Sequence, residues 1–272
     1  MIDSYAVIGN PISHSKSPLI HTLFSRQTNQ SLHYDSILAP SDGFQLAVTK
    51  FRQQGGKGMN VTVPFKLEAY RLSTQLTERA CIAQAVNTLR FDDQEILGDN
   101  TDGAGLVRDI EHNLSIPIAN KRILLMGAGG AARGVILPLL KQSPSMLAIA
   151  NRSPHKAQAL QQQFSPYGQT MAGDYMSFSG QCFDIVINAT SASLQDALPA
   201  LPLHIFAHGS LAYDMMYGKE PTRFLKFAQQ QGADQLADGL GMLVEQAAES
   251  FLLWRGIRPE TRSIIAMLKS QT

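Results

Sequence analysis

The chain has 272 residues, of which 44% are hydrophobic and 17% charged, which is enough to build two domains with buried cores. Its 23 basic and 22 acidic residues give a formal net charge of +1. No basic block is long enough to follow a nucleic-acid backbone, and no apolar run approaches the roughly 18 residues of a membrane span, so we expect neither partner. Strand-like sequence begins at the N-terminus without a targeting segment, which predicts a cytoplasmic location.

Strand and helix patterns alternate at the start of the chain. Three apolar runs predict strands and one amphipathic run predicts a helix, at residues 4–9, 32–39 and 58–63 for the strands and 42–53 for the helix. Pro18 opens an earlier helix, with Ser17 in the N-cap position. This order predicts a parallel α/β sheet, which binds ligands at the carboxyl ends of its strands. Ser15 and Ser17 could hold a carboxylate at that helix start; simple capping by Ser17 is the alternative.

Polar residues gather where the third strand ends, in the sequence NVTVPFK. Asn60, Thr62 and Lys66 are therefore expected near the ligand-binding edge, and Pro64 begins a new helix. Lys66 is unusual because a cation in the first turn of a helix opposes the helix dipole, at a cost of a few tenths to about 1 kcal/mol. We expect a functional reason for its position; an exposed lysine whose stem reaches water is the alternative.

The chain then runs toward a second domain. A helix over residues 67–83 precedes a strand over 86–91, which carries Asn87. Asp102 could cap the next helix, over residues 103–114, and that capping role is the structural alternative to a functional one. We expect the boundary between the two domains at the start of this helix.

The second half opens with a strand, a tight turn and a helix. Residues 123–126 predict a buried strand, Gly127, Gly129 and Gly130 end it, and helical spacing resumes at Ala131. Gly127 lets the backbone turn, and Gly129 lets it approach a diphosphate, whose charge suits a helix N-terminus. The pattern predicts a dinucleotide site; an ordinary turn between a strand and a helix is the alternative.

The next strand indicates which dinucleotide to expect. Residues 146–150 form it and deliver Asn151, Arg152 and Ser153 roughly 20 residues after the glycines, where such a fold recognises the adenosine ribose. A chain that binds NAD usually has Asp or Glu there. Here Arg152 and Lys156 offer positive charge to a 2′-phosphate, so NADP is predicted. A solvated basic loop is the alternative.

The remaining patterns complete this domain and return to the first. They predict two strands and four helices, at residues 183–189 and 211–217 for the strands and 156–164, 221–230, 242–254 and 261–269 for the helices. Thr190 follows the first of these strands, at an edge that faces the cofactor in a doubly wound sheet. Cys81 and Cys182 show neither CxxC nor His spacing, so we expect buried free thiols and no disulfide or metal site.

Together, these motifs resemble those of the NADP-dependent shikimate dehydrogenase family, from Tyr5 to Trp254. In chain order they are YAVIGNPISHSKSP, NVTVPFK, AVNTL, GDNTDG, GAGGAAR, NRS with Lys156, INATSA, YDMMYG and GLGMLVEQAA. The resemblance implies two α/β domains and a C-terminal helix that returns to the first. The first is a substrate-binding domain with a parallel-type sheet, residues 1–102 and 239–272, and the second a Rossmann-like NADP-binding domain, residues 103–238. The implied reaction is the reversible reduction of 3-dehydroshikimate to shikimate in aromatic amino-acid (chorismate) biosynthesis.

The resemblance also implies residue roles. The catalytic pair would be Lys66 and Asp102. The substrate-binding residues would be Ser15 and Ser17 at the carboxylate, Asn60, Thr62, Asn87 and Gln246 at the ring hydroxyls, and Tyr217. The cofactor-binding residues would be Gly127, Gly129, Gly130 and Ala131 at the diphosphate, Asn151, Arg152, Ser153 and Lys156 at the adenosine phosphate, and Thr190, Met215, Gly239 and Met242 around the rest. The chain departs from the family at Ser193, where glycine is usual, and at Ser153, where threonine is commoner.

Three alternatives are left open. A quinate/shikimate dehydrogenase would use NAD or either cofactor, and Arg152 argues against it. A regulatory dinucleotide sensor would keep the fold without the chemistry, and the presence of Lys66 and Asp102 argues against it. A methylene-tetrahydrofolate dehydrogenase has a similar architecture, but paired serines before Pro18 suit a small carboxylate rather than a pterin. Both a monomer and a homodimer agree with the sequence.

Overall fold

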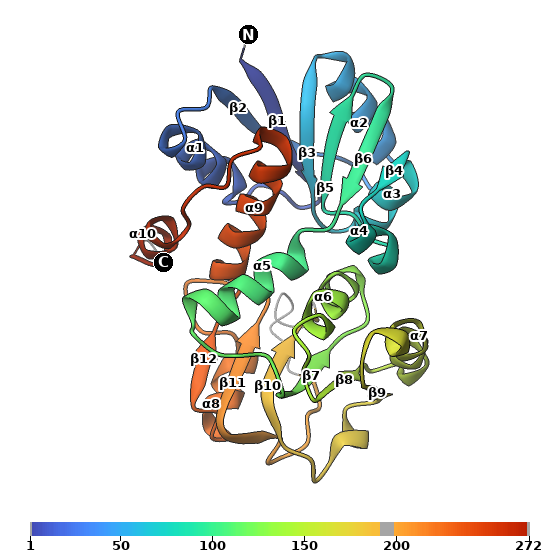
Figure 1. Ribbon diagram of the computed structural model, residues 1–272, viewed down its shortest axis with the longest axis vertical. Coiled ribbons are helices and arrows are strands. Elements are labelled where there is room, and N and C mark those ends of the chain that lie inside the picture. Colours follow the sequence, from blue (N-terminus) through green and yellow to red (C-terminus); the bar gives the residue numbers. More distant parts are fainter. Residues whose placement is uncertain (1, 191–198, 271–272) are drawn as a thin grey trace. The chain divides into compact units, whose positions relative to one another are not determined.

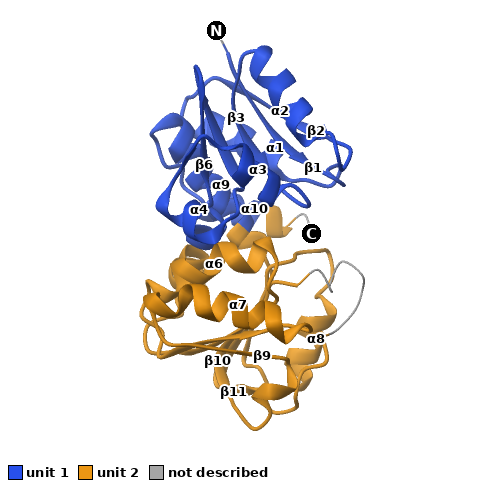
Figure 2. Cartoon of the chain, turned by 90° about the vertical axis from the view of Figure 1, so that its right-hand side faces the viewer, with its two compact units in different colours: residues 1–105, 243–267 blue, residues 106–242, 268–272 orange. Residues whose placement is uncertain are grey.

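The computed structural model describes residues 2–190 and 199–270, and the chain divides into two compact units (Figure 2). Unit 1 comprises Met1–Gly105 and Leu243–Met267, and unit 2 comprises Leu106–Met242 and Leu268–Thr272. Within the described residues, each unit is built on its own six-stranded sheet. Two α/β units and a C-terminal helix that returns to the first confirm the predicted fold class.

Unit 1 alternates strands and helices before it receives the end of the chain (Figure 1). Its first part contains β1 (Asp3–Gly9), α1 (Ser17–Gln27), β2 (Leu32–Leu38), α2 (Phe44–Gln53), β3 (Gly56–Val61), α3 (Lys66–Leu72), β4 (Gln75–Leu76), α4 (Glu78–Ala83), β5 (Thr88–Asp92) and β6 (Glu95–Asp99). Helix α5 (Asp102–Arg108) begins in this unit, and most of α9 (Leu240–Arg255) and α10 (Arg262–Ser270) belongs to it.

The sheet of unit 1 has the strand order β2-β1-β3-β5-β6-β4. β1 pairs in parallel with β2 and β3, which confirms the pattern predicted for the first three strands. β5 runs antiparallel to both β3 and β6, so the complete sheet is mixed. The reason is the connection between β5 and β6: a loop of two residues, Asp93 and Gln94, can only join antiparallel neighbours. The sequence patterns did not predict β6.

The predicted helix over residues 67–83 is wrong in its middle. α3 ends at Leu72, after which the chain forms β4 and then α4. Thr74 donates its backbone N–H to the Ile96 carbonyl at 3.0 Å, so this segment joins the sheet beside β6. Thr77 then starts α4 as its N-cap, where its hydroxyl accepts a hydrogen bond from the N–H of Ala80. Pairing with a strand distant in sequence therefore overrides the local helical spacing.

The pleat of β1 sorts the core of unit 1 into two faces, because successive side chains point to opposite sides of a strand. Ala6 and Ile8 join the buried cluster that α2 and α3 complete. Tyr5 and Val7 join a second cluster, which includes Trp254 of α9. Figure 1 shows the same arrangement, with α2 and α3 on one side of this sheet and α1 and α9 on the other.

Unit 2 is a parallel α/β domain. It contains the π-helical continuation of α5 (Asp109–Asn113), β7 (Arg122–Met126), α6 (Gly130–Leu140), β8 (Met146–Ala150), α7 (Pro154–Phe164), β9 (Thr170–Gly173), β10 (Phe183–Asn188), β11 (Phe206–Asp214), α8 (Arg223–Gln230) and β12 (Gln235–Ala237). The described strands are all parallel, in the order β12-β11-β10-β7-β8-β9. This is the order of dinucleotide-binding domains, with its switch point between β7 and β10, so the Rossmann-like prediction is confirmed.

Some element limits in unit 2 differ from the prediction. The two edge strands, β9 and β12, were not predicted, because each is short and only partly apolar. β11 was expected over residues 211–217, but it begins at Phe206 and ends at Asp214. Its end coincides with that of its neighbour, since Asn188 and Asp214 are the last residues paired between β10 and β11.

The cysteines are free, as predicted, but the prediction that they are buried is wrong, because both are exposed. Cys81 belongs to α4, whose buried face is formed by Ala80 and Ala83, so its side chain points away from the core. Cys182 stands just before β10, where burial begins at Phe183. No helix in the described part of the chain combines the length and apolar character that crossing a membrane requires.

Candidate active site

The predicted substrate residues of unit 1 gather at one edge of its sheet. β1 leads into the loop that carries Ser15 and into α1, which starts at Ser17, while β3 carries Asn60 and ends just before Thr62. The chain order reverses between β1 and β3, since β2 lies on the other side of β1. A Cβ on Gly9 would collide with Thr62, so the two strand ends approach closely. Such a switch point is where α/β sheets bind their ligands.

The start of α1 differs from the prediction. Lys16 is the N-cap residue, whereas Ser17 is the first residue of the helix and only 6% exposed. The hydroxyl oxygen of Ser15 accepts a hydrogen bond from the N–H of Ser17 at 3.3 Å. Capping therefore does not explain Ser17. The hydroxyl groups of Ser15 and Ser17 lie together at the positive end of the α1 dipole, which suits an anionic ligand.

Lys66 and Asp102 are in contact, although 36 residues separate them in the sequence. The distance between Lys66 Nζ and Asp102 Oδ2 is 2.5 Å, and the two side chains are only 16% and 8% exposed. Each is the first residue of its helix, Lys66 of α3 and Asp102 of α5. The carboxylate compensates for the unfavourable position of the ammonium group at a helix N-terminus, since opposite charges attract strongly where water is scarce.

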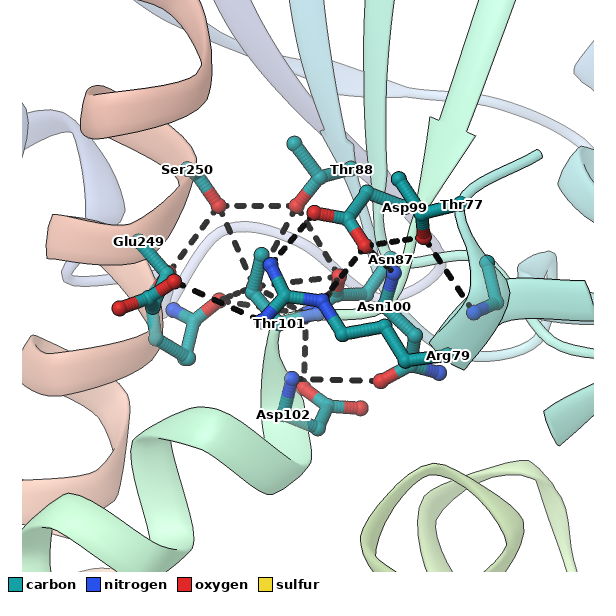
Figure 3. Close-up of polar contacts among 12 residues, drawn as sticks. Thr77, Arg79, Asn87, Thr88, Asp99, Asn100, Thr101, Asp102, Glu249 and Ser250 are labelled. Carbon is teal, nitrogen blue, oxygen red and sulfur yellow. Dashed lines mark hydrogen bonds and ion pairs between the residues drawn. The ribbon is translucent and has the colours of Figure 1, made fainter. Parts of the chain in front are cut away.

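Asn87 holds the second oxygen of Asp102 (Figure 3). Its Nδ2 donates to Asp102 Oδ1 at 2.8 Å, and its Oδ1 accepts from the Thr101 N–H at 2.8 Å. The carboxamide cannot turn round without placing its oxygen against the carboxylate, so its orientation is fixed. Gln246 of α9 lies beside it, with Oε1 at 3.3 Å from Asn87 Nδ2. The fold thus brings Lys66, Asp102, Asn87 and Gln246 into one polar cluster.

The turn that carries Asp102 is anchored by residues for which no role was predicted. Asp99, 1% exposed, accepts hydrogen bonds from Arg79 at 2.7 and 2.6 Å and from Thr77 at 2.6 Å. Burial opposes ionisation of Asp99, but the Arg79 guanidinium, the Thr77 hydroxyl and the Asn100 N–H together outweigh burial and lower the pKa of this carboxyl. Asn100 Oδ1 then accepts from the Asp102 N–H at 3.2 Å. The signal in the sequence was the run DNTD, four polar residues at the end of an apolar strand.

Glycines shape the turn after β7 in unit 2. Gly127 has a φ of +111°, which other residues rarely adopt, and a Cβ there would lie 3.1 Å from Ala189 O and 3.3 Å from Thr190 Cγ2. A Cβ on Gly129, by contrast, would have no described atom within 4 Å. Gly130 begins α6 directly behind it. The turn and Thr190 therefore flank the switch point and leave open space over a helix N-terminus, which fits a diphosphate.

The residues after β8 present positive charge. Arg152 and Lys156 are exposed, and Asn151 Nδ2 donates to Ser153 O at 3.0 Å, which shapes the turn between them. Burial raises the pKa of Tyr175, and the charge and backbone N–H of Arg152 partly offset this effect, so Arg152 lies near that phenol. β8 is the immediate neighbour of β7, the strand that ends at the glycine turn.

Met215 and Gly239, two further predicted cofactor residues, meet at the end of β11. The N–H of Gly239 donates to Met216 O at 3.0 Å, and a Cβ on Gly239 would collide with the Met215 carbonyl oxygen, so only glycine fits. Asp214, fully buried, accepts from the Met216 N–H at 3.0 Å and from Asn188 Nδ2 at 3.2 Å. These bonds tie the ends of β10 and β11 together.

The two units divide the predicted site residues between them. All predicted cofactor residues belong to unit 2, including Met242, which is 6% exposed. The predicted catalytic and substrate residues belong to unit 1, except Tyr217, which follows β11 in unit 2. Ser193 falls within residues 191–198, outside the described residues. Among the residues that are described, no group of three His, Cys, Asp or Glu could hold a metal ion.

Comparisons with known proteins find one consistent set of relatives. Three family models match the chain: the shikimate dehydrogenase substrate binding domain over residues 7–89, shikimate/quinate 5-dehydrogenase over residues 110–195, and the shikimate 5′-dehydrogenase C-terminal domain over residues 239–268. Shikimate dehydrogenase (NADP(+)) of Nitrosospira multiformis is 66% identical over 270 residues, which cover 99% of this chain and 98% of that protein.

Solved structures give the same result. The crystal structure of an Ael1 enzyme from Pseudomonas putida has a TM-score of 0.92 at 52% identity, covering 98% of both chains. Shikimate 5-dehydrogenase from Thermus thermophilus in complex with NADP(H) and shikimate has a TM-score of 0.88 at 27% identity, covering 100% of both chains.

Proposed function

The chain belongs to the shikimate dehydrogenase family, and from this premise we propose that it catalyses the reversible NADPH-dependent reduction of 3-dehydroshikimate to shikimate in aromatic amino-acid (chorismate) biosynthesis. The observation that carries this proposal is the contact between Lys66 and Asp102, at 2.5 Å and largely out of water. It provides an ammonium group, held by a carboxylate, at the edge of the sheet where the other proposed substrate residues lie.

Lys66 is the proposed proton donor. NADPH, when bound, supplies a hydride to the ketone carbon of the substrate. The carbonyl oxygen then gains negative charge and needs a proton from a nearby group, which Lys66 Nζ donates; in the reverse direction the amine accepts it. Asp102 orients the ammonium group through Oδ2, while Asn87 holds Asp102 through Oδ1. The carboxylate thus stays in place while the lysine changes charge.

NADP is the proposed cofactor, and the residues of unit 2 fit it. The N-terminus of α6 offers backbone N–H groups to the diphosphate, and the space over Gly129 lets the diphosphate approach the backbone. Arg152 and Lys156 are placed to meet a 2′-phosphate. The other proposed cofactor contacts are Gly127, Gly130, Ala131, Asn151, Ser153, Thr190, Met215, Gly239 and Met242.

The proposed substrate contacts provide hydrogen bonds rather than an apolar pocket. Ser15 and Ser17 would bind the carboxylate at the start of α1. The ring hydroxyls would be bound by Asn60, Thr62, Asn87 and Gln246, with Tyr217 as a further contact. A site built from such groups discriminates strongly, because an analogue that lacks a hydroxyl leaves a buried polar group without a partner. We propose residues 1–102 and 239–272 as the substrate-binding domain and 103–238 as the NADP-binding domain.

A spectrophotometric assay tests the activity. Oxidation of shikimate and of quinate is followed by the absorbance of reduced nicotinamide, with NADP⁺ and with NAD⁺. We expect turnover of shikimate with NADP⁺. Preference for quinate or NAD⁺ would identify the quinate/shikimate type instead, and no turnover of either acid would favour the regulatory protein. Cytoplasmic location and oligomeric state, monomer or homodimer, stay predictions.

Lys66→Ala tests the assignment of the proton donor. We expect kcat to fall by about 10²- to 10⁴-fold, the usual contribution of a general acid, with a modest change in the KM of shikimate. Lys57→Ala is the matched control, because Lys57 is an exposed lysine in β3. If Lys66→Ala keeps a turnover near that of the wild type, Lys66 is not the donor.

A further inference from the structure

The side chain of Asn60 is hydrogen-bonded at both ends. It is 5% exposed in β3. Its Oδ1 accepts a hydrogen bond from the Tyr34 hydroxyl at 2.7 Å. Its Nδ2 donates to Ser250 Oγ at 2.9 Å and lies 3.2 Å from Thr88 Oγ1. Three elements far apart in the sequence, β2, β5 and α9, thus converge on one carboxamide.

These contacts define which end of the carboxamide is oxygen and which is nitrogen. The backbone carbonyl of Asn87, which can only accept, lies 3.4 Å from Nδ2. Thr88 donates its own proton to Asn87 Oδ1 at 3.0 Å, so its oxygen is an acceptor toward Asn60. A rotated carboxamide would place Oδ1 against that carbonyl and lose the bond from Tyr34. Its two N–H groups are thus engaged within the protein, whereas Oδ1 accepts the bond from Tyr34 and, as a carbonyl oxygen, has a second lone pair. The Asn60 side chain also lies near the His21 ring, because it partly offsets the effect of burial on the pKa of that imidazole.

Tyr34 is held firmly on the other side. It is 6% exposed, and its ring stacks on His21 with a centroid distance of 4.2 Å and an interplanar angle of 6°. Burial raises the pKa of Tyr34 well above its ordinary value, and the Ser17 hydroxyl only partly offsets this effect. The phenol therefore keeps its proton and acts as a donor to Asn60.

We propose that Tyr34 and Ser250 are positioning residues, which hold the Asn60 carboxamide in the one orientation that offers its oxygen to a hydroxyl group of the substrate ring. This inference rests on the proposed function for the identity of the substrate. Neither residue needs to touch the substrate: Tyr34 acts on Oδ1 and Ser250 on Nδ2. The arrangement selects a substrate group that can donate a hydrogen bond, which a hydroxyl does and an ether or a hydrogen atom does not.

Tyr34→Phe and Ser250→Ala in the full chain test the inference by steady-state oxidation of shikimate with NADP⁺. Each variant should raise the KM of shikimate about tenfold, the equivalent of one lost hydrogen bond, with kcat within about twofold and the KM of NADP⁺ unchanged. Tyr5→Phe is the matched control. It removes a phenol hydroxyl from the same aromatic cluster, where that hydroxyl faces Arg255 instead of Asn60. An unchanged KM in Tyr34→Phe would overturn the inference.

A double-mutant cycle separates positioning from a general structural role. In an Asn60→Ala background, Tyr34→Phe should cause no further change in the KM of shikimate, because there is no carboxamide left to orient. An equal increase in both backgrounds would overturn the positioning role, because Tyr34 would then act through the fold or through the neighbouring Ser17 hydroxyl and not through Asn60.

A measurement without substrate keeps the inference testable if the protein does not oxidise shikimate, an outcome that would refute the proposed function alone. Hydrogen exchange of the Asn60 side-chain N–H groups is followed by NMR, with signals assigned through Asn60→Asp. We expect slow exchange in the wild type and in Tyr5→Phe, and exchange at least about tenfold faster in Ser250→Ala. Equal rates in all three proteins would refute the positioning role.

Discussion

We predict that His21 makes the stability of unit 1 depend on pH. It lies on α1 with no exposed surface, and neither ring nitrogen makes a regular hydrogen bond to any described residue. Aromatic rings surround it, among them Tyr34 at 4.2 Å, Trp254 at 5.3 Å and Phe24 at 5.8 Å between ring centroids. A charged imidazolium would have no water and no carboxylate in this cluster, so we expect His21 to stay neutral in the folded protein.

The magnitude follows from the pKa. Burial lowers the pKa of His21 from 6.5 to about 3, and the side chain of Asn60 offsets only part of that effect. The unfolded chain takes up a proton below its own pKa, near 6.5, whereas the folded chain does not. The contribution of the neutral His21 side chain to the free energy of unfolding is therefore fully present well above pH 6.5 and is lost as the pH falls toward 3. Integration between pH 7.5 and pH 5.0 gives a loss of about 2 kcal/mol in the free energy of unfolding.

Urea unfolding at these two pH values measures the effect, with the fluorescence of Trp254 as the signal. Trp254 is the single tryptophan of the chain and lies in the same cluster as His21, so it reports on unit 1. Between pH 7.5 and pH 5.0, the free energy of unfolding of His21→Phe should fall by about 2 kcal/mol less than that of the wild type. His33→Gln, which removes an exposed histidine from β2, is the control. Equal losses in His21→Phe and the wild type would refute the reasoning.

Three further predictions concern the cofactor turn, the basic turn and the anchor of Asp102. Gly129→Ala should leave the melting temperature unchanged, because a Cβ at this position meets no described atom within 4 Å. It should raise the KM of NADP⁺ by up to about 30-fold, because the added methyl group keeps the diphosphate away from the N-terminus of α6. An unchanged KM of NADP⁺ would contradict this prediction. Arg152→Gln should raise the KM of NADP⁺ about 10- to 100-fold without affecting that of NAD⁺, as measured in parallel assays. Asp99→Asn should lower the free energy of unfolding by about 3 kcal/mol, as measured in urea titrations. This value is at the low end of the range for breaking a buried ion pair, because the Arg79 side chain is 28% exposed. The same variant should also lower kcat.

The sequence alone determined those features that depend on neighbours within one turn or one strand. The apolar run before Gly127 and the helical spacing after Gly130 define β7 and α6, because strand and helix have different side-chain periods. β8 was predicted residue for residue for the same reason. Lys66 could be identified as unusual, since the conflict between its charge and a helix N-terminus is local.

Only the tertiary structure determined the strand pairings and side-chain contacts between residues that are far apart in the sequence. Thr74 leaves a helical pattern because a strand that follows later in the chain accepts its N–H. Asn87 meets Gln246 across 159 residues, and Asn60 meets Ser250 across 190 residues, so no sequence spacing indicates either contact. Hydrogen bonds and burial at such separations depend on which strands become neighbours in the sheet. The strand order depends on the packing of the whole core and not on the sequence of any single segment.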